Sequence, residues 1–131
     1  MTSPVQLTDA GRAFLDEYHL ATLSTMGRDG GVHVVAVGFT LGEDGYVRII
    51  TNDGSQKVVN VERDDRATVA QVAGPAWLSI AGRAEIERDP AAVAHAVELY
   101  ANRYRQPREN PNRVVIRIAP TKVMGSPGLR A

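Results

Sequence analysis

The chain has 131 residues, with 15 lysines and arginines against 15 aspartates and glutamates, and no cysteine. This length suits one domain, and a formal net charge of zero argues against a general nucleic-acid binder. Without cysteine, disulfides, thiolate metal ligands and a cysteine nucleophile are excluded. The N-terminus lacks the basic and apolar regions of a signal peptide, and no apolar run approaches membrane-span length. We therefore expect residues 1–131 to form a single cytoplasmic domain.

The first half of the chain predicts a helix and three strands joined by hairpin turns. The helix begins at Thr8, a good N-cap, with Asp9 in its first turn. Aspartates followed by glycines at 28–31 and 42–45 are typical of tight hairpins. The second strand is so apolar that we expect both of its faces to be covered. The expected elements are a helix at 8–18 and strands at 20–26, 32–41 and 46–51.

The second half predicts a short helix, three more strands and a longer amphipathic helix. Asp89 and Pro90 mark the start of the longer helix, as N-cap and first helical residue, and Pro107 stands beyond its end. The expected elements are a helix at 55–62, strands at 67–72 and 76–87, a helix from 90 towards 107, and a strand at 113–118 continuing to 124. Hairpin-connected strands, not interleaved with long helices, predict a mainly β fold: a small six-stranded antiparallel barrel with flanking helices.

The most informative stretch runs from Thr51 to Lys57, where an apolar strand passes through a short polar turn into a helix. The helix opens at Ser55, so free backbone N–H groups, the positive end of the helix dipole and a lysine converge there. This combination predicts an anion site, in particular for a phosphate. The alternative is a capped surface helix with a solvent-exposed lysine.

No catalytic constellation is visible in the sequence. There is neither a glycine-rich dinucleotide fingerprint nor a phosphate-binding loop of the Walker type. His19, His33 and His95 are scattered and lack the spacing of metal ligands, so no metal site is expected. Paired carboxylates for acid–base catalysis cannot be recognised either. A phosphate-bearing cofactor is therefore the expected source of any chemistry.

Other polar and aromatic residues have two interpretations each. Trp77, the single tryptophan, suits stacking on a planar ligand or, equally, a place in a core or interface. Gln71 and Ser79 stand in apolar strands and either bond a ligand or face water. Four arginines near the end of the last helix predict either an anion-binding face or a solvated basic surface. They are Arg103, Arg105, Arg108 and Arg113.

Together these segments resemble the split β-barrel flavin and deazaflavin family, whose founding member is pyridoxamine 5′-phosphate oxidase. The resemblance runs from about Leu7 to Gly125 and includes the Trp77-Leu78-Ser79 strand. Within the family the chain is most similar to the branch that uses coenzyme F420, and there to F420-dependent biliverdin reductases. The segments that carry this likeness are 33–40, 54–57, 103–105 with 107–108, and 113–116 leading to 123–126.

The resemblance implies an FMN-binding-like split barrel that forms a homodimer, with two cofactor sites at the subunit interface. It implies cofactor-binding roles for thirteen residues. They are Val34, Val35, Ala36, Val37, Thr51, Asn52, Ser55, Gln56, Lys57, Trp77, Ser79, Met124 and Gly125. Lys57 and its neighbours would hold the cofactor phosphate, and Arg105 and Arg108 the substrate propionates or the glutamate tail of the cofactor.

Two departures from the oxidases favour F420 over flavin mononucleotide (FMN). Gln56 and His33 stand where the oxidases place arginines, and a single lysine suits a phosphodiester better than a terminal phosphate. The chain also ends without the oxidases' C-terminal substrate-binding segment. The resemblance then implies hydride transfer from reduced F420 to the C10 methine of biliverdin, giving bilirubin, with no side-chain nucleophile. The alternatives are an F420-binding or storage protein without turnover, and an FMN-dependent oxidoreductase of the same fold.

Overall fold

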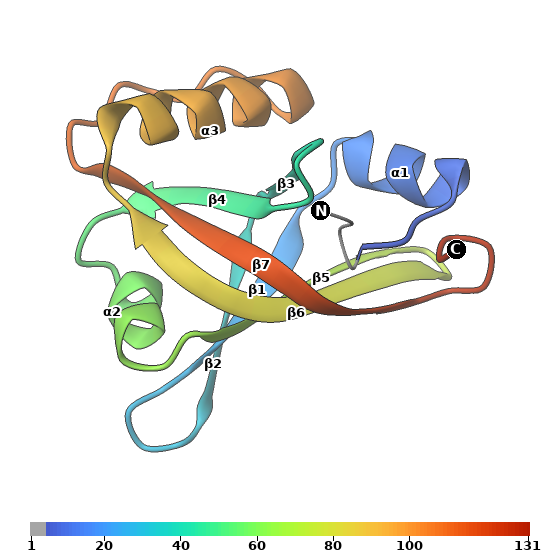
Figure 1. Cartoon of the computed structure of the whole chain (residues 1–131), viewed down its shortest axis with the longest axis horizontal. Coiled ribbons are helices and arrows are strands. Elements are labelled where there is room, and N and C mark those ends of the chain that lie inside the picture. The colour runs from blue at the N-terminus through green and yellow to red at the C-terminus, as the bar shows by residue number, and fades with distance from the viewer. Residues whose placement is uncertain (1–4) are drawn as a thin grey trace.

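A computed structural model describes residues 5–131 as one curled antiparallel sheet with three helices (Figure 1). Most of the N-terminal segment that bears on a signal peptide lies outside the described residues. The helices are α1 (Asp9–Asp16), α2 (Gln56–Arg63) and α3 (Pro90–Arg103). The strands are β1 (Ala21–Met26), β2 (Val32–Val37), β3 (Thr40–Leu41), β4 (Val47–Asn52), β5 (Arg66–Ala73), β6 (Ala76–Glu87) and β7 (Arg113–Gly125). Within these residues, no helix is both long and apolar enough to cross a membrane.

The strand order is β2-β1-β5-β6-β7-β4-β3, and every neighbouring pair is antiparallel. The two longest strands, β6 and β7, run through the middle of the sheet, and its ends curl towards each other (Figure 1). The pairing of β6 with β7 shifts register between Ala81 and Gly82. A Cβ atom on Gly82 would lie 2.1 Å from the backbone oxygen of Ala119, so only glycine allows this close approach. The short end strand β3 pairs only with the beginning of β4, and the other end strand, β2, is not hydrogen-bonded to β4, which leaves a split between β2 and the end of β4.

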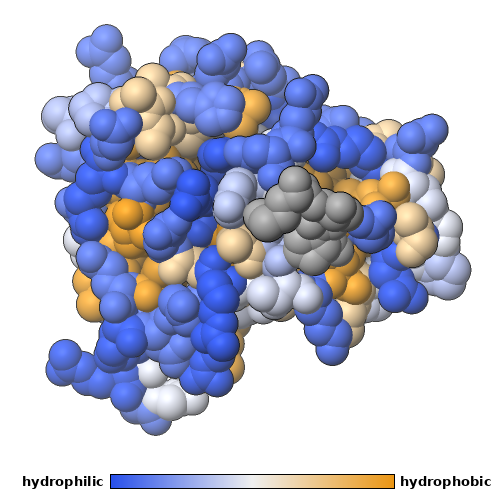
Figure 2. All heavy atoms as spheres, viewed as in Figure 1, coloured by the Kyte–Doolittle hydropathy of each residue, from blue (hydrophilic) through white to orange (hydrophobic). Residues whose placement is uncertain are grey.

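The hydrophobic core lies inside the curl of the sheet. Leu23, Ile49, Val69 and Ile80 are almost fully buried there, and they come from four different strands. Helix α2 adds Val58 and its neighbours to the same core. Because β-branched and aliphatic residues alternate with polar ones along the strands, one face of the sheet is buried and the other is not. On the side seen in Figure 2, most of the surface is hydrophilic, with small apolar areas between charged side chains.

The structure has seven strands, so the prediction of six was wrong in this detail. The predicted strand at 32–41 is broken at Gly38 and Phe39 into β2 and the short β3. At the break, the Phe39 N–H donates to the Tyr104 hydroxyl (3.2 Å), and the Phe39 carbonyl accepts from Arg103. Side chains at the end of α3 thus form hydrogen bonds with backbone groups that would otherwise pair with a neighbouring strand. The break was invisible in the sequence because its partners lie some 60 residues away.

The expectation that both faces of the apolar strand 32–41 are covered is also wrong for the single chain. In β2, Val35 and Val37 face the core, whereas Val32, Val34 and Ala36 are exposed. Val32 keeps 62% of its accessible surface, which is unusual for valine. Burial within one chain therefore does not explain the apolar composition of β2.

The predicted helix caps are confirmed. The Thr8 side chain accepts a hydrogen bond from the Gly11 N–H (3.0 Å), and the Asp89 side chain accepts from the Ala92 N–H (3.2 Å). The last helix ends at Arg103, before the proline that was expected to end it, because Arg103 and the residue after it are tied to other elements.

Candidate functional site

A cavity of about 340 Å³ lies in the split between the two ends of the sheet. One side is the end of β2, the other is the end of β4, and α3 with its connection to β7 forms a third wall. The lining residues are Ala36, Val37, Gly38, Ile50, Thr51, Asn52, Lys57, Tyr100, Pro107, Asn110 and Arg113. Because β2 pairs only with β1, the backbone N–H and C=O groups on its other edge face this split without a strand partner.

The turn from β4 to α2 presents the start of the helix to this region. Gly54 has a φ of 81°, a conformation that glycine adopts without strain, and the Ser55 N–H donates to the Asn52 carbonyl (3.2 Å). Ser55 is the N-cap, yet its side chain makes no capping hydrogen bond and lies 3.4 Å from the Thr51 hydroxyl. The first N–H groups of α2 therefore have no side-chain acceptor and remain available to an anion.

Lys57, in the first turn of α2, is half-buried and has no ion-pair partner within 4.0 Å among residues 5–131. Burial lowers the pKa of Lys57 below its ordinary value of 10.5, because the charged form loses hydration. A partly desolvated, unpaired cation beside free helix N–H groups is an unsatisfied arrangement. Binding a phosphate oxygen would satisfy both the ammonium group and the helix end.

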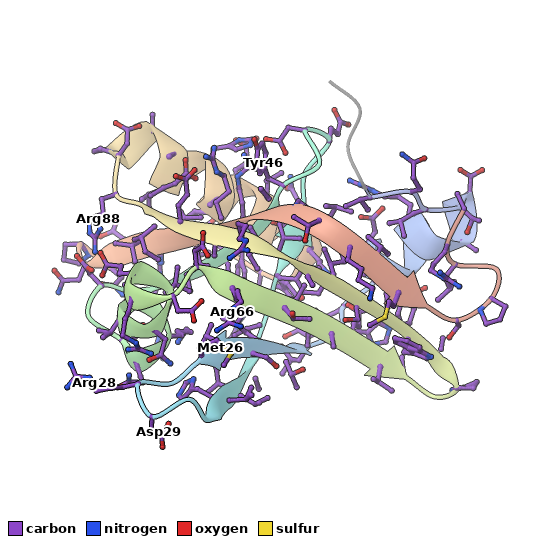
Figure 3. All side chains as sticks on the ribbon, turned by 60° about the horizontal axis from the view of Figure 1, so that its bottom comes forward. Met26, Arg28, Asp29, Tyr46, Arg66 and Arg88 are labelled. Carbon is purple, nitrogen blue, oxygen red and sulfur yellow. The ribbon has the colours of Figure 1, made fainter. Side chains whose placement is uncertain are left out.

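Two acidic residues of the β4–α2 segment are neutralised on the outside of the molecule. Arg88 donates to both carboxylate oxygens of Asp53 (3.1 and 2.9 Å) and to Glu62 (3.3 Å). The Arg88 hydrogen bond holds the pKa of Asp53 below its ordinary value. Figure 3 places Arg88 beyond the end of β6, beside the turn that leads into α2. Neither acid lines the cavity, so neither offsets the positive charges of Lys57 and Arg113, which both line it.

The third wall brings in Asn110 and Tyr100, to which the sequence gave no site role, together with Arg113 of the predicted arginine cluster. Asn110 donates from its side-chain amide to the Asn52 side chain, and Arg113 donates to the Arg108 carbonyl (2.8 Å). The Tyr100 ring packs so closely on β2 that a Cβ atom on Gly38 would lie 3.1 Å from it. Arg113 belongs to the arginine cluster for which the sequence predicts an anion-binding face or a solvated surface, whereas no pattern in the sequence marks Tyr100 or Asn110 as a site residue.

Gln56 points away from this cavity, into a second one of about 290 Å³ on the other side of the start of α2. Its amide donates to Asn60 (2.8 Å), and buried Asn60 donates in turn to Thr25 (3.1 Å). His33 lines the same cavity, and its Nδ1 atom is buried without a hydrogen-bond partner among the described residues. The Gln56 amide is therefore engaged by Asn60, the residue that joins α2 to β1.

The structure brings together only part of the predicted cofactor set within one chain. Ala36, Val37, Thr51, Asn52 and Lys57 line the same cavity. Others lie elsewhere: Val34, Trp77, Ser79 and Met124 on the outer face of the sheet, Val35 against the core, and Gly125 opposite Leu78 in the β6–β7 pair. Arg105 and Arg108 are exposed and do not line the cavity.

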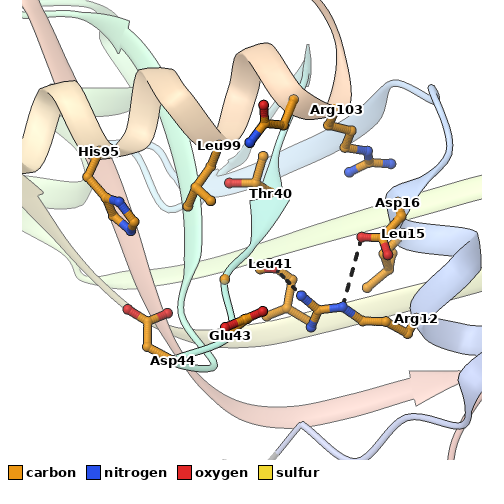
Figure 4. A pocket seen from close by; sticks show the side chains of 12 residues that line it. Arg12, Leu15, Asp16, Thr40, Leu41, Glu43, Asp44, His95, Leu99 and Arg103 are labelled. Atoms are coloured by element: carbon orange, nitrogen blue, oxygen red, sulfur yellow. Dashed lines mark hydrogen bonds and ion pairs between the residues drawn. The ribbon is translucent and has the colours of Figure 1, made fainter.

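A larger cavity, of about 560 Å³, lies elsewhere, between α1, β3 and α3 (Figure 4). Its guanidinium groups are engaged internally. Arg12 donates to the Leu41 carbonyl (2.8 Å) and lies 3.9 Å from Asp16, whereas Arg103 bonds backbone carbonyls and Gln71. None of the predicted cofactor residues lines it, so volume alone does not make it the functional site.

Comparison with known proteins supports the fold. Residues 7–125 match the family described as pyridoxamine 5′-phosphate oxidase. A relative from Mycobacterium tuberculosis (strain CDC 1551 / Oshkosh), named F420H(2)-dependent biliverdin reductase, is 47% identical over 130 residues, covering 98% of this chain and 95% of the relative.

Two solved structures show the same fold at low sequence identity. A conserved hypothetical protein from Mycobacterium tuberculosis is 24% identical with a TM-score of 0.77, over 95% of this chain and 89% of that one. A protein titled F420 reductase is 20% identical with a TM-score of 0.72, over 95% of this chain and 98% of that one. With a family match over most of its length and a relative of such high identity, the chain belongs to the pyridoxamine 5′-phosphate oxidase family.

Proposed function

We propose that this protein is an F420H2-dependent reductase that transfers a hydride to the C10 methine of biliverdin and so forms bilirubin. The observation that carries the proposal is Lys57: a half-buried, unpaired cation at the start of α2, in a cavity between unpaired sheet ends. The chain is also 47% identical to a relative named F420H(2)-dependent biliverdin reductase, which supports the choice of cofactor and substrate.

The residues of the split fit the parts of F420. Lys57 and the first N–H groups of α2, with Ser55, would hold the phosphate, and Thr51 and Asn52 would bond the chain that joins phosphate to ring. Ala36 and Val37, on the free edge of β2, would hold the ring edge through backbone groups. When bound, reduced F420 supplies the hydride, whereas the protein binds, orients and excludes water.

The electrostatics of the phosphate region favour F420 over FMN. Lys57 is the one cation in the described first turn of α2, whereas Arg113 lines the cavity from β7. The Gln56 amide is bonded to Asn60 and is not turned towards the same space. A phosphodiester carries one charge, whereas the terminal phosphate of FMN carries nearly two. The lysine and the helix N–H groups match the smaller charge.

We further propose that the protein acts as a homodimer through the outer face of the sheet. Val34, Val72, Trp77 and Met124 lie on that face, and each is at least 40% exposed. Several exposed apolar side chains on one face of a sheet mark an interaction surface. A second subunit on this face explains why β2 is apolar on both sides. The partner would then supply the predicted residues Trp77, Ser79, Met124 and Gly125 to the split.

Two finer assignments follow from the same proposal. Arg105 and Arg108, exposed on the connection from α3 to β7, would meet the glutamate tail of F420, which extends from the phosphate into solvent. The proton that completes the reduction would come from solvent or from an arginine at the split. The cytoplasmic location expected from the sequence remains a prediction.

Equilibrium binding of oxidised F420 and of FMN to the purified protein tests the cofactor first. We expect saturable F420 binding with weak or no FMN binding; tight FMN binding without F420 binding would contradict the proposal and favour an FMN-dependent oxidoreductase. Anaerobic mixing of F420H2 with biliverdin then tests turnover. Loss of the biliverdin absorbance with formation of bilirubin is expected, whereas F420 binding without any turnover would leave a binding or storage protein.

A further inference from the structure

The cavity in the split contains more positive charge than the cofactor phosphate requires. Lys57 and Arg113 both line it, and no carboxylate does. Asp53 and Glu62, the acids of the adjoining segment, are engaged by Arg88 outside the cavity. Two cations in one small cavity without an acid repel each other and favour a ligand with more than one anionic group.

Arg113 is fixed on a rigid element. It is the first residue of β7 and lies opposite Asn52 in the pairing with β4, and its N–H donates to the Asn110 carbonyl (3.1 Å). Its side chain makes one hydrogen bond, to the Arg108 carbonyl (2.8 Å), and no carboxylate lies within 4.0 Å among residues 5–131. Most of its guanidinium donors are thus free, in the planar arrangement that binds a carboxylate through two parallel hydrogen bonds.

The wall beside Arg113 suits a flat conjugated molecule. Tyr100 and Pro107 line it, and the Tyr100 ring lies against the backbone of Gly38 at the end of β2. An aromatic ring and a proline offer apolar contact to a planar body, and Arg113 lies at the same wall. The phosphate would bind at the start of α2, which is not part of this wall.

We propose that Arg113 anchors a carboxylate of the electron acceptor and so determines substrate class: conjugated acceptors that carry carboxylate side chains, such as the propionates of a tetrapyrrole. This inference rests on the proposed function, which assigns Lys57 to the cofactor phosphate. It gives the substrate-binding role to Arg113 and leaves the exposed Arg105 and Arg108 to the cofactor tail.

Arg113→Gln tests the assignment, with biliverdin and its dimethyl ester as paired ligands. The ester keeps the conjugated body but has no propionate charge. Binding of each ligand to protein saturated with oxidised F420 is followed by quenching of the single tryptophan, Trp77. We expect Arg113→Gln to weaken biliverdin binding roughly tenfold or more, with little effect on the ester. Arg113→Lys should restore part of the affinity, because lysine keeps the charge but loses the planar pair of donors.

Arg28→Gln is the matched control, since Arg28 is exposed on the β1–β2 turn, away from the cavity (Figure 3), and has no ion-pair partner among the described residues. It should bind both ligands like the unmodified protein. In steady-state turnover, Arg113→Gln should raise KM for biliverdin and leave kcat within about twofold.

Three results would overturn the inference: equal weakening of biliverdin and ester, a raised Kd for F420 itself with unchanged biliverdin binding, or the same loss in Arg28→Gln. Failure of the proposed function is recognised separately. If the proposed function is wrong but Arg113 does bind carboxylates, the unmodified protein would still bind biliverdin in an Arg113-dependent manner. It would then fail to reduce biliverdin with F420H2, or fail to bind F420.

Discussion

Lys57 illustrates at the scale of a single residue how burial prepares a side chain for a ligand. Its ammonium group is half-buried without a counter-ion in the described chain, and its pKa is lowered by that burial. An ion in this position gains from a bound anion what it lost in hydration. The same residue therefore connects cofactor affinity to pH.

Replacing Lys57 by alanine should raise the Kd for F420 by about 10- to 100-fold, equivalent to about 1–3 kcal/mol for a charge-assisted hydrogen bond. Fluorescence titration of F420 measures this change. Lys122→Ala is the control, because Lys122 is the other lysine of the chain, is exposed on β7 and does not line the cavity. An unchanged Kd for Lys57→Ala would refute the phosphate assignment.

The pH dependence follows from the direction of the shift. As pH rises through the lowered pKa of Lys57, the ammonium loses its proton and F420 binding should weaken; the Lys57→Ala variant should lack this dependence. For the ligand-free protein the sign is opposite. The unfolded chain holds the Lys57 proton to higher pH than the folded chain, so the contribution of this group to stability rises with pH in that window. Titrations and urea unfolding at several pH values measure both trends, and a loss of F420 affinity shared equally by both proteins would assign it to another group.

At the scale of elements, one buried polar network fixes α3 and therefore the third wall of the cavity. Arg103 donates to the carbonyls of Glu17 (3.0 Å), His19 (3.3 Å) and Phe39, and to the fully buried side chain of Gln71. Burial lowers the pKa of Arg103, and carbonyl dipoles stabilise its charge in place of a carboxylate. This network joins the end of α3 to the connection between α1 and β1, to β5 and to the break between β2 and β3.

Arg103→Met should reduce the free energy of unfolding by about 2–4 kcal/mol, because it leaves the Gln71 oxygen and several carbonyls without donors. Urea denaturation monitored by circular dichroism measures the loss. Arg105→Met makes the same change two residues later at an exposed position and should cost less than about 0.5 kcal/mol. Equal effects of the two variants would show that the network contributes no more than a surface arginine.

At the scale of the whole molecule, the outer face of the sheet is an apolar surface that a single chain leaves uncovered. The exposed apolar side chains there include Val72, which keeps 68% of its accessible surface and lies opposite Trp77 in the β5–β6 pair. The predicted cofactor residues Trp77, Ser79 and Met124 lie on this face and do not line the split. Dimer formation and cofactor binding should therefore depend on each other.

Val72→Lys should convert the protein from dimer to monomer and weaken F420 binding, because a charge would be buried at the interface. Sedimentation velocity gives the oligomeric state, and fluorescence titration gives the affinity. Val59→Lys is the control, since Val59 is exposed on α2, outside the sheet face, and its substitution should leave the mass unchanged. A Val72→Lys protein that keeps the mass of the unmodified one, or an unmodified protein that is already monomeric, would contradict the dimer proposal.

The sequence by itself determined the elements whose signals are local. Thr8 and Asp89 cap their helices as predicted, Gly30 and Gly45 take positive φ values in the expected turns, and Ser55 stands at the start of α2. Hairpin connectivity was enough to predict a mainly β antiparallel fold. The position of Lys57 at a helix start was also predictable, because cap, dipole and lysine lie within three residues of one another.

Only the tertiary structure decided what depends on contacts between distant residues. The break after β2 exists because Tyr104 and Arg103 take the backbone groups of Phe39. The third wall of the cavity, with Arg113, is formed because the curled sheet and α3 bring β7 to the end of β4. Periodicity along the chain reports which face is apolar but not what covers it. Both faces of β2 were therefore expected to be covered, and one of them is exposed in the single chain. Local sequence fixes dihedral angles and caps, whereas the enclosure of a site is a property of how the sheet closes.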